Sequence, residues 1–379
     1  MNKKILLIII FYFQLPIIYK SIYGFNISEC ENINVTANAT DIIEQYTIHL
    51  DVEPQERWKE ISLIKKNNIS GLLNSLKNHL PNSIKQPIIN YIDKNLPKLI
   101  SYFGEYGEEI KGISKYTGIE LGEIIFYNIF YEIFAFCTSI VIQDTHNNIF
   151  HVRNLDFGLF MGFITPYLKD LVVEISFVKD GIEQYKIHTY AGYIGALSSI
   201  KPYKYSLTLN LRWAFNGGYM GFIDWFLGNK NQHWIAIITR EILKYNETFI
   251  DAYHTLSKIS LISPIYFILA GVKPYEGVII TRDRNMSLYP KFLDNNSWFL
   301  VQTNYDHWTN PPFFDDRRTP AEICLNKIDR EKITINNSFS VLRTKPVLNK
   351  LTTFSSFINP KKNIFYGYRQ YCPDPCPAF

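Results

Sequence analysis

The sequence predicts an α+β protein in which β-sheets are stacked between helical layers. Three observations predict this class: the first third of the chain has a helical spacing of apolar residues, short β-branched and aromatic runs follow, and a helical stretch interrupts these runs. Strands, then helices, then strands again favour stacked layers. A length of 379 residues suits one compact body with a large mixed sheet.

The helical region extends from about Asp41 to Phe134. Its apolar residues recur three and four positions apart, and Asn, Pro and Gly residues separate the periodic segments. The predicted helices cover residues 54–66, 70–80, 84–104 and 118–134.

The strand region begins at Cys137, where the runs become short and are bounded by turn residues. Helices are expected again between about Tyr219 and Ser260, and a short one near the C-terminus. The predicted strands are 137–143, 148–154, 171–178, 183–192, 205–213, 264–271, 276–283, 297–306, 351–358 and 362–369, and the later helices include 220–228, 233–245 and 319–328.

The composition limits the classes of function. Hydrophobic residues make up 47% of the chain and charged residues 20%, which indicates a folded core. A net charge of +4 is small for this length, so it does not support a nucleic-acid partner, although it suits an anionic lipid surface. No HExxH, Walker loop, GxSxG or GxGxxG motif occurs, so we expect neither a metal nor an organic cofactor.

The N-terminus has the composition of a secretory signal peptide. Two lysines precede an apolar run from Ile5 to about Ile18, so residues 1–24 are expected to be removed. An uncleaved anchor is the alternative, but Gln14 and Pro16 interrupt the run, which is shorter than the roughly 20 residues of a membrane span. Export agrees with eight N-x-S/T glycosylation sequons, at Asn26, Asn34, Asn38, Asn68, Asn246, Asn285, Asn295 and Asn336.

Five cysteines are informative in a secreted chain, because an odd number leaves one thiol unpaired. If residues 144–148 (DTHNN) form a turn, the flanking strands make an antiparallel hairpin that places Cys137 opposite residues 154–156. Arg153 and Asp156 then approach Cys137. A guanidinium lowers the pKa of a thiol, and a carboxylate beside it fixes its position, so Cys137 suits a nucleophile held by an oriented ion pair. On spacing alone, a buried structural cysteine is the alternative.

A set of ten strings, in order along the chain, resembles the acid ceramidase family. The similarity extends from the helical region to the C-terminus. The strings are FCTSIV, HVRNLDFG, AGYIGALS, NGGYMGFIDW, YFILAG, VIITRDR, VQTNYD, PPFFDDRRTPAEICLN, TKPVLNKLTTF and CPDPC.

The resemblance implies an N-terminal nucleophile hydrolase, an αββα sandwich whose precursor is cut between Phe136 and Cys137. It therefore implies a helical α subunit (residues 25–136) and a catalytic β subunit (residues 137–379). The cut would expose an α-amine on Cys137, and an α-amine has a pKa of about 7.7 to 8.0 in model peptides. One residue could then supply both the nucleophile and the general base.

The resemblance also implies a role for each site residue. Cys137 attacks the amide carbonyl, Arg153 and Asp156 organise the cysteine and its amine, Asn304 stabilises the oxyanion, and Arg317 is a further polar contributor. Without the resemblance, Asn304 would be interpreted as a turn residue that closes a strand. The chain departs from the family at Leu211, where relatives commonly have an acidic residue, and a leucine accepts no hydrogen bond.

The disulfide pairing is likewise implied by the resemblance. With Cys137 free, the remaining four cysteines allow three pairings. The resemblance selects Cys30 with Cys324, which would link the α and β chains after the cut, and Cys372 with Cys376. A pairing of Cys30 with a tail cysteine remains the alternative.

The implied activity is hydrolysis of N-acylsphingosine, a ceramide, to sphingosine and a fatty acid, in the lysosome or after secretion. A lipid-presenting activator protein and an anionic vesicle surface are the further expected partners. The alternatives are an amidase for N-acylethanolamines and a weakened relative that only binds lipid. Aromatic residues could line the channel for the acyl chain, with ordinary core packing as the alternative: Trp213, Phe215, Tyr219, Phe222, Trp225 and Phe226.

Overall fold

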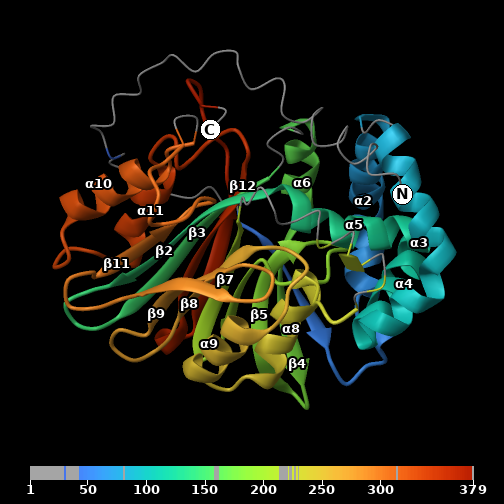
Figure 1. Cartoon of the computed structure of the whole chain (residues 1–379), viewed down its shortest axis with the longest axis horizontal. Helices are drawn as coiled ribbons and strands as arrows, with labels where there is room; N and C mark the ends of the chain where they lie inside the picture. Colours follow the sequence, from blue (N-terminus) through green and yellow to red (C-terminus); the bar gives the residue numbers. More distant parts are fainter. Residues whose placement is uncertain are drawn as a thin grey trace.

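Two stacked β-sheets form the centre of the molecule (Figure 1). The computed structural model describes residues 30, 42–79, 82–157, 162–212, 221, 224–225, 228, 230–312 and 315–377. The signal-peptide prediction therefore lies outside the described residues.

The smaller sheet contains the hairpin around Cys137. Its five strands are ordered β11–β2–β3–β12–β13. The predicted turn is present, because Asp144 Oδ1 accepts the backbone N–H groups of His146 (2.8 Å) and Asn148 (2.7 Å) between β2 and β3. The strands are β2 (Ala135–Gln143), β3 (Ile149–Phe157), β11 (Phe299–Gln302), β12 (Thr352–Asn359) and β13 (Ile364–Arg369).

The larger sheet has eight strands in the order β1–β4–β5–β6–β7–β8–β9–β10. Three of its strands, β1, β6 and β10, were not predicted from the sequence. The strands are β1 (Glu44–His49), β4 (Val172–Lys179), β5 (Ile182–Tyr190), β6 (Ser198–Lys201), β7 (Tyr205–Leu211), β8 (Ile265–Ala270), β9 (Gly277–Arg282) and β10 (Ser287–Phe292).

Strand β1 corrects the prediction that the chain is helical from about Asp41. It pairs in parallel with β4, with Tyr46 opposite Ile175 and Ile48 opposite Phe177. Tyr46 and Ile48 alternate with polar residues, the period expected of a half-buried strand. A pairing partner so distant in sequence overrides the local helical tendency.

Four helices of the N-terminal region pack together beside one end of the sheets (Figure 1). The predicted helices at residues 54–66 and 70–80 join in one helix, α2, because the break expected between them is absent. The helices are α2 (Lys59–His79), α3 (Asn82–Phe103), α4 (Glu105–Thr117) and α5 (Leu121–Phe134). Helix α5 continues directly into β2, which begins at Ala135.

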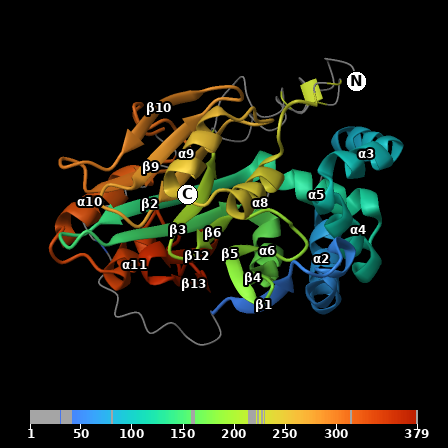
Figure 2. The ribbon, with the colours of Figure 1, turned by 90° about the horizontal axis from the view of Figure 1, so that it is seen from below.

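The outer faces of both sheets carry helices (Figures 1 and 2). Helices α8 and α9 lie on the larger sheet, and α10 and α11 on the smaller one; α6 and α11 were not predicted, and most of the predicted helix at 220–228 lies outside the described residues. The bounds are α6 (Thr165–Leu171), α8 (Ile235–Tyr245), α9 (Phe249–Lys258), α10 (Arg318–Ile328) and α11 (Ile335–Arg343), with 3₁₀ turns at Pro54–Glu56, Gly162–Ile164 and Pro360–Lys362.

Two apolar clusters define the faces of the smaller sheet. Val141 and Ile149 pack against Ile268 of the larger sheet, whereas Ile140 and Val152 pack under α10 and α11. Because side chains alternate along a strand, odd-numbered residues of β2 and β3 face the other sheet. The predicted αββα sandwich is confirmed. Within the described part of the chain, no helix has both the length and the apolar character needed to span a membrane.

Candidate active site

Cys137 is the free cysteine among the described residues, and its side chain has no exposed area. It is the third residue of β2 and pairs with Leu155 of β3, in the middle of the range that the hairpin predicted. The structure contains both disulfides that the resemblance implied, Cys30–Cys324 and Cys372–Cys376. The nucleophile candidate is thus buried between the two sheets.

Arg153 lies on the same face as Cys137 and contacts it directly. Its Nη2 atom is 2.7 Å from the sulfur and also donates to the Leu209 carbonyl at 2.6 Å. Its Nη1 atom donates to the Leu197 carbonyl (2.7 Å) and to Ser198 Oγ (3.1 Å). Leu209 and Ser198 belong to strands of the larger sheet and Leu197 to the loop just before β6, so the stacking of the sheets positions Arg153 against the thiol.

Asp156 lies on the opposite face of the smaller sheet, which corrects the predicted ion pair with Arg153. Residues three apart on a strand point to opposite sides, so Arg153 and Asp156 do not share a face. The carboxylate of Asp156 accepts hydrogen bonds from Arg317 (2.9 Å), Thr352 (2.7 Å) and Asn349 (3.2 Å), and both members of the Asp156–Arg317 pair are fully buried.

Asn304 joins this ion pair to Cys137. Its Oδ1 atom accepts the backbone N–H of Cys137 at 2.8 Å and Arg317 Nη2 at 2.7 Å. Its Nδ2 atom donates to the carbonyl of Leu211 at 2.7 Å. The other four predicted site residues therefore converge on Cys137 from two faces of the sheet, with Arg153 at the sulfur and the linked side chains of Asp156, Arg317 and Asn304 at the nitrogen.

Burial and neighbouring charges act in opposite directions on the pKa values of the uncut site. Burial raises the pKa of the Cys137 thiol above its ordinary value, although Arg153 acts in the opposite direction. Burial also raises the pKa of Asp156, against the influence of Arg317. For Arg317, burial alone would lower the pKa, but Asp315 and Asp156 raise it above its usual range. In the intact chain, burial therefore opposes formation of the Cys137 thiolate, while Arg153 favours it.

A buried chain of polar side chains on β7 and β2 was not predicted. Asn210 Nδ2 donates to the carbonyls of Gln302 (2.8 Å) and Cys137 (3.4 Å), and its Oδ1 accepts from Ser139 Oγ at 2.8 Å. Ser139 in turn accepts from Thr208 (2.9 Å). The sequence did contain a signal for this chain, because polar residues occupy alternate positions of the predicted strand. These residues are all buried in the structure: Ser206, Thr208 and Asn210.

His151 ends this polar chain between the sheets. Its Nε2 atom is 2.9 Å from Thr208 Oγ1 and its Nδ1 atom is 2.9 Å from Ser206 Oγ. Thr208 donates its only hydrogen to Ser139, so the imidazole must donate from Nε2. Burial, with a smaller effect of Arg153, lowers the pKa of His151 to about 3, so the ring is neutral.

Leu211, the departure from the family pattern, lies at the end of β7. Alternation along β7 directs Asn210 toward Cys137 and Leu211 toward the α8–α9 side. The neighbouring Arg212 is balanced, because it forms a bidentate pair with Asp306 at 2.7 and 2.8 Å. Asp224, another acid near in sequence, pairs with Arg284 (2.7 Å).

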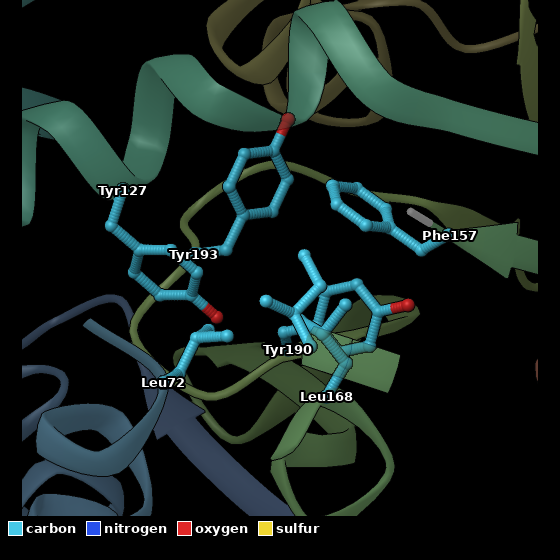
Figure 3. A pocket seen from close by; sticks show the side chains of 7 residues that line it. Leu72, Tyr127, Phe157, Leu168, Tyr190 and Tyr193 are labelled. Carbon is cyan, nitrogen blue, oxygen red and sulfur yellow. The ribbon is translucent and has the colours of Figure 1, made fainter. Parts of the chain in front are cut away.

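The aromatic residues proposed for an acyl channel are mostly outside the described part of the chain. Trp225 is described and buried, with edge-to-face contacts to Tyr102 and Trp234 at 5.0 Å each. This is core packing. An apolar cavity of about 10 Å³, roughly the size of one water, lies elsewhere, between the helical region and the sheets (Figure 3); it is lined by Leu72, Tyr127, Phe157, Ile164, Leu168, Tyr190 and Tyr193.

The predicted sequons differ in accessibility. Asn285, Asn295 and Asn336 are exposed, whereas Asn68 and Asn246 are half-buried, and Asn246 Nδ2 donates to Thr255 Oγ1 at 2.9 Å. Asn26, Asn34 and Asn38 lie outside the described residues.

Two sheets between helical layers, with a buried cysteine near the start of a central strand, define an N-terminal nucleophile amide hydrolase. Residues 137–372 match the model of linear amide C–N hydrolases, choloylglycine hydrolase family, and residues 41–103 match the model named beta subunit of N-acylethanolamine-hydrolyzing acid amidase.

Individual relatives narrow the class. The chain is 45% identical to acid ceramidase of Macaca fascicularis and 44% identical to acid ceramidase of Homo sapiens, in both cases over 87% of each chain. A solved structure of the Caenorhabditis elegans N-acylethanolamine-hydrolyzing acid amidase ortholog is 33% identical, with a TM-score of 0.55, and covers 62% of this chain and 100% of that chain. The chain therefore belongs to the acid ceramidase family of linear amide hydrolases.

Proposed function

We propose that the protein is an acid ceramidase, which hydrolyses the amide bond of N-acylsphingosine to sphingosine and a free fatty acid. The observation that carries the proposal is the arrangement at Cys137, whose sulfur is 2.7 Å from Arg153 and whose backbone nitrogen is 2.8 Å from Asn304. One residue thus presents both a nucleophile and an oriented nitrogen. The identity to acid ceramidases over most of the chain supports the substrate class.

Self-cleavage between Phe136 and Cys137 activates the enzyme in this proposal. The Cys137 sulfur attacks the Phe136 carbonyl carbon and forms a thioester as the C–N bond breaks, and the thiol proton passes to the nitrogen, which becomes the α-amine. Water then hydrolyses the thioester, which releases the Phe136 carboxylate and restores the thiol. The burial of Cys137 supports this step, because a substrate cannot reach a side chain with no exposed area.

Turnover repeats the same chemistry on the lipid. The α-amine accepts the thiol proton, and the thiolate attacks the ceramide carbonyl. The proton passes to the sphingosine nitrogen as the C–N bond breaks, and water hydrolyses the acyl thioester to the fatty acid. Arg153 stabilises the thiolate, and Asn304, fixed by Arg317 and Asp156, orients the amine.

Asn304 also remains our candidate for the oxyanion donor. One of its amide hydrogens is directed to the Leu211 carbonyl, so the uncut structure shows the orienting contact rather than the oxyanion contact. An oxyanion role therefore requires that Asn304 Nδ2 also reach the substrate oxygen after the cut.

Hydrolysis of N-acylethanolamines is the second candidate activity. It is favoured by the match of residues 41–103 to a model named for that amidase and by the similarity to the nematode amidase structure. Both activities would use the same nucleophile and differ in the groove that holds the amine product.

The cellular setting completes the proposal. A signal peptide at residues 1–24, glycans at the eight sequons, and a lysosomal or secreted location follow from the secretory features of the sequence. The disulfide Cys30–Cys324 would hold the α chain (25–136) to the β chain (137–379) after the cut. A lipid-presenting activator protein and anionic vesicles are the proposed partners for substrate delivery.

Mass spectrometry and a substrate comparison test the proposal together. The expected result is a fragment that begins at Cys137 after acidification, and faster release of fatty acid from N-acylsphingosine than from an N-acylethanolamine at acidic pH. A preference for the ethanolamide would support the second candidate. A permanently single chain that binds lipid without hydrolysis would indicate a non-catalytic relative, and Cys137→Ala is the control that should abolish both cut and turnover.

A further inference from the structure

We propose that Asn128, in the helical segment N-terminal to the cut, is a positioning residue for the active site, acting through the buried loop 191–197 that holds Arg153 against Cys137. The inference rests on the proposed function. It assigns the segment 25–136 a role in catalysis besides covering the site.

The loop connects β5 to β6, and all its residues are buried. Asn128 bonds it on both edges: Nδ2 donates to the Gly192 carbonyl at 2.9 Å, and Oδ1 accepts the Ile194 N–H at 2.8 Å. Nδ2 also donates to the Ile124 carbonyl (2.9 Å) within α5, which fixes the rotamer of Asn128. A single amide side chain thus replaces the backbone partner that a strand would have supplied to this loop.

The neighbouring residue on α5 makes a further contact. Tyr127 donates from its hydroxyl to the Ala191 carbonyl at 3.2 Å. Gly192 has a φ of +87°, and a Cβ there would lie 3.1 Å from a ring carbon of Tyr127. A side chain at position 192 would therefore be strained by the positive φ and crowded against α5, which favours glycine where the helix and the loop approach each other.

The catalytic segment holds the loop from the other side. Arg240 donates to the Ile194 carbonyl (3.0 Å), and Thr239 accepts the Ala196 N–H (3.1 Å). Ile194 is consequently bonded through its N–H to the helical segment and through its carbonyl to α8. The loop is clamped between the two segments that the cut would separate.

The end of the loop reaches the nucleophile. Arg153 Nη1 donates hydrogen bonds to the Leu197 carbonyl and to Ser198 Oγ. The Nη2 atom of the same guanidinium is 2.7 Å from the Cys137 sulfur. A shift of Leu197 would therefore reorient the guanidinium at the sulfur. Catalytic geometry tolerates only displacements well below about 1 Å. A loosened loop should therefore slow the reaction more than it weakens substrate binding.

The experiment compares three variants of the full precursor after maturation. Asn128→Ala removes the clamp, Tyr127→Phe removes only the hydroxyl contact, and Thr117→Val is the matched control. Thr117 is a buried residue of the same helical segment whose hydroxyl donates within its own helix, to Ile113 at 2.7 Å. The measurements are kcat and KM on N-acylsphingosine, and the pH dependence of Cys137 alkylation by iodoacetamide.

For Asn128→Ala, we expect kcat to fall about 10- to 100-fold with KM within about threefold of wild type. The alkylation profile should move to higher pH by about half a unit or more, because a displaced Arg153 stabilises the thiolate less. Tyr127→Phe should show a smaller change in the same direction, and Thr117→Val should match wild type in both measurements.

Two results with a mature, active wild-type enzyme would overturn the inference. One is an equal loss of kcat in Asn128→Ala and Thr117→Val, and the other is an unchanged pH dependence of Cys137 alkylation in Asn128→Ala. If Asn128→Ala fails to mature, Tyr127→Phe alone decides through its alkylation profile. A wild-type protein that is cut and prefers another amide would overturn only the proposed substrate, since the alkylation measurement does not depend on ceramide.

Discussion

The Oδ1 atom of Asn304 accepts the backbone N–H of Cys137 at 2.8 Å while accepting Arg317 Nη2 at 2.7 Å. The nitrogen of the proposed scissile bond is therefore already held before any cut. Because Arg317 is also paired with Asp156 on the far face of the sheet, the position of this nitrogen depends on residues that never touch the sulfur.

Replacing Asn304 should impair the reaction rather than binding. In Asn304→Ala the α-amine loses its acceptor and the oxyanion its candidate donor, so kcat should fall by about 100-fold or more, with KM changed little. Self-cleavage should slow in parallel. Steady-state kinetics and the rate of appearance of the Cys137 fragment check this, with the exposed Asn296→Ala as control; a change confined to KM would contradict it.

The buried pair Asp156–Arg317 should be asymmetric in its contribution to stability. Arg317→Met leaves Asp156 and Asp315 without their shared cation, which should cost about 3 to 5 kcal/mol of unfolding free energy. Asp156→Asn leaves Arg317 paired with Asp315 and should cost less. Urea unfolding of both variants in an uncut Cys137→Ala background measures the difference, and equal costs would show that Asp315 does not compensate.

His151 should make the protein less stable as the pH falls. Its pKa is about 3 in the folded chain and about 6.5 when unfolded, so its contribution is complete above pH 6.5 and is lost as the pH falls toward 3. The loss approaches about 1.4 kcal/mol per pH unit below the unfolded-state pKa, and amounts to about 2 kcal/mol between pH 6.5 and 4.5. His151→Gln, which cannot be protonated, should show a correspondingly shallower decline in urea midpoint over this range. The exposed His254→Gln is the control, and a decline as steep as that of wild type would refute the assignment.

Restoring an acid at position 211 should not raise activity. Leu211 is buried on the side of β7 away from Cys137, and the adjacent Arg212 already has a carboxylate partner in Asp306. Leu211→Glu should therefore bury an uncompensated charge and lower stability by about 3 kcal/mol at neutral pH. Ceramide hydrolysis and thermal unfolding, with Leu211→Gln as the uncharged comparison, check this; a sharp gain in turnover would show that the missing acid limits the enzyme.

The two disulfides should differ in what their removal does. Cys30→Ser with Cys324→Ser opens a bond that spans 294 residues and joins the two proposed chains, whereas Cys372→Ser with Cys376→Ser opens one that spans 4. In the uncut precursor the first change should cost about 4 to 5 kcal/mol and the second much less. After the cut, non-reducing denaturing electrophoresis should show separate chains only for the Cys30→Ser, Cys324→Ser variant. If the two chains stay linked in both variants, the assignment of the Cys30–Cys324 bond as the interchain link is wrong.

Local patterns predicted the hairpin well. The turn at residues 144–148 and the alternation of β2 and β3 placed Cys137 opposite Leu155, because both depend on residues close in sequence. The same alternation rule separates Arg153 from Asp156, so the error in the predicted ion pair could have been avoided from the sequence.

The remaining features depend on distant contacts. Asn304 and Arg317 lie 167 and 161 residues from the groups they bond, Cys137 and Asp156, and only the family resemblance pointed to them. Strand β1 was missed because its partner β4 is more than 120 residues away, and six residues beside long helices carry too weak a periodic signal. The contacts of Asn128 with the loop 191–197 could not be predicted from the sequence either. A buried asparagine in a helix has no distinguishing sequence pattern, and its partners are known only once the position of the loop is known.

Helix α5 continues directly into β2, and this connection affects whether the proposed cleavage can be reversed. The proposed cut between Phe136 and Cys137 would turn one neutral amide into a carboxylate and an α-amine, in a place where Phe136 is only 4% exposed. The new anion also lies just beyond the C-terminal end of α5, where the helix dipole is already negative. Both effects raise the free energy of the new Phe136 carboxylate in its original location and favour its movement into water. The cleavage should therefore be irreversible on storage, on dilution or on a return to neutral pH.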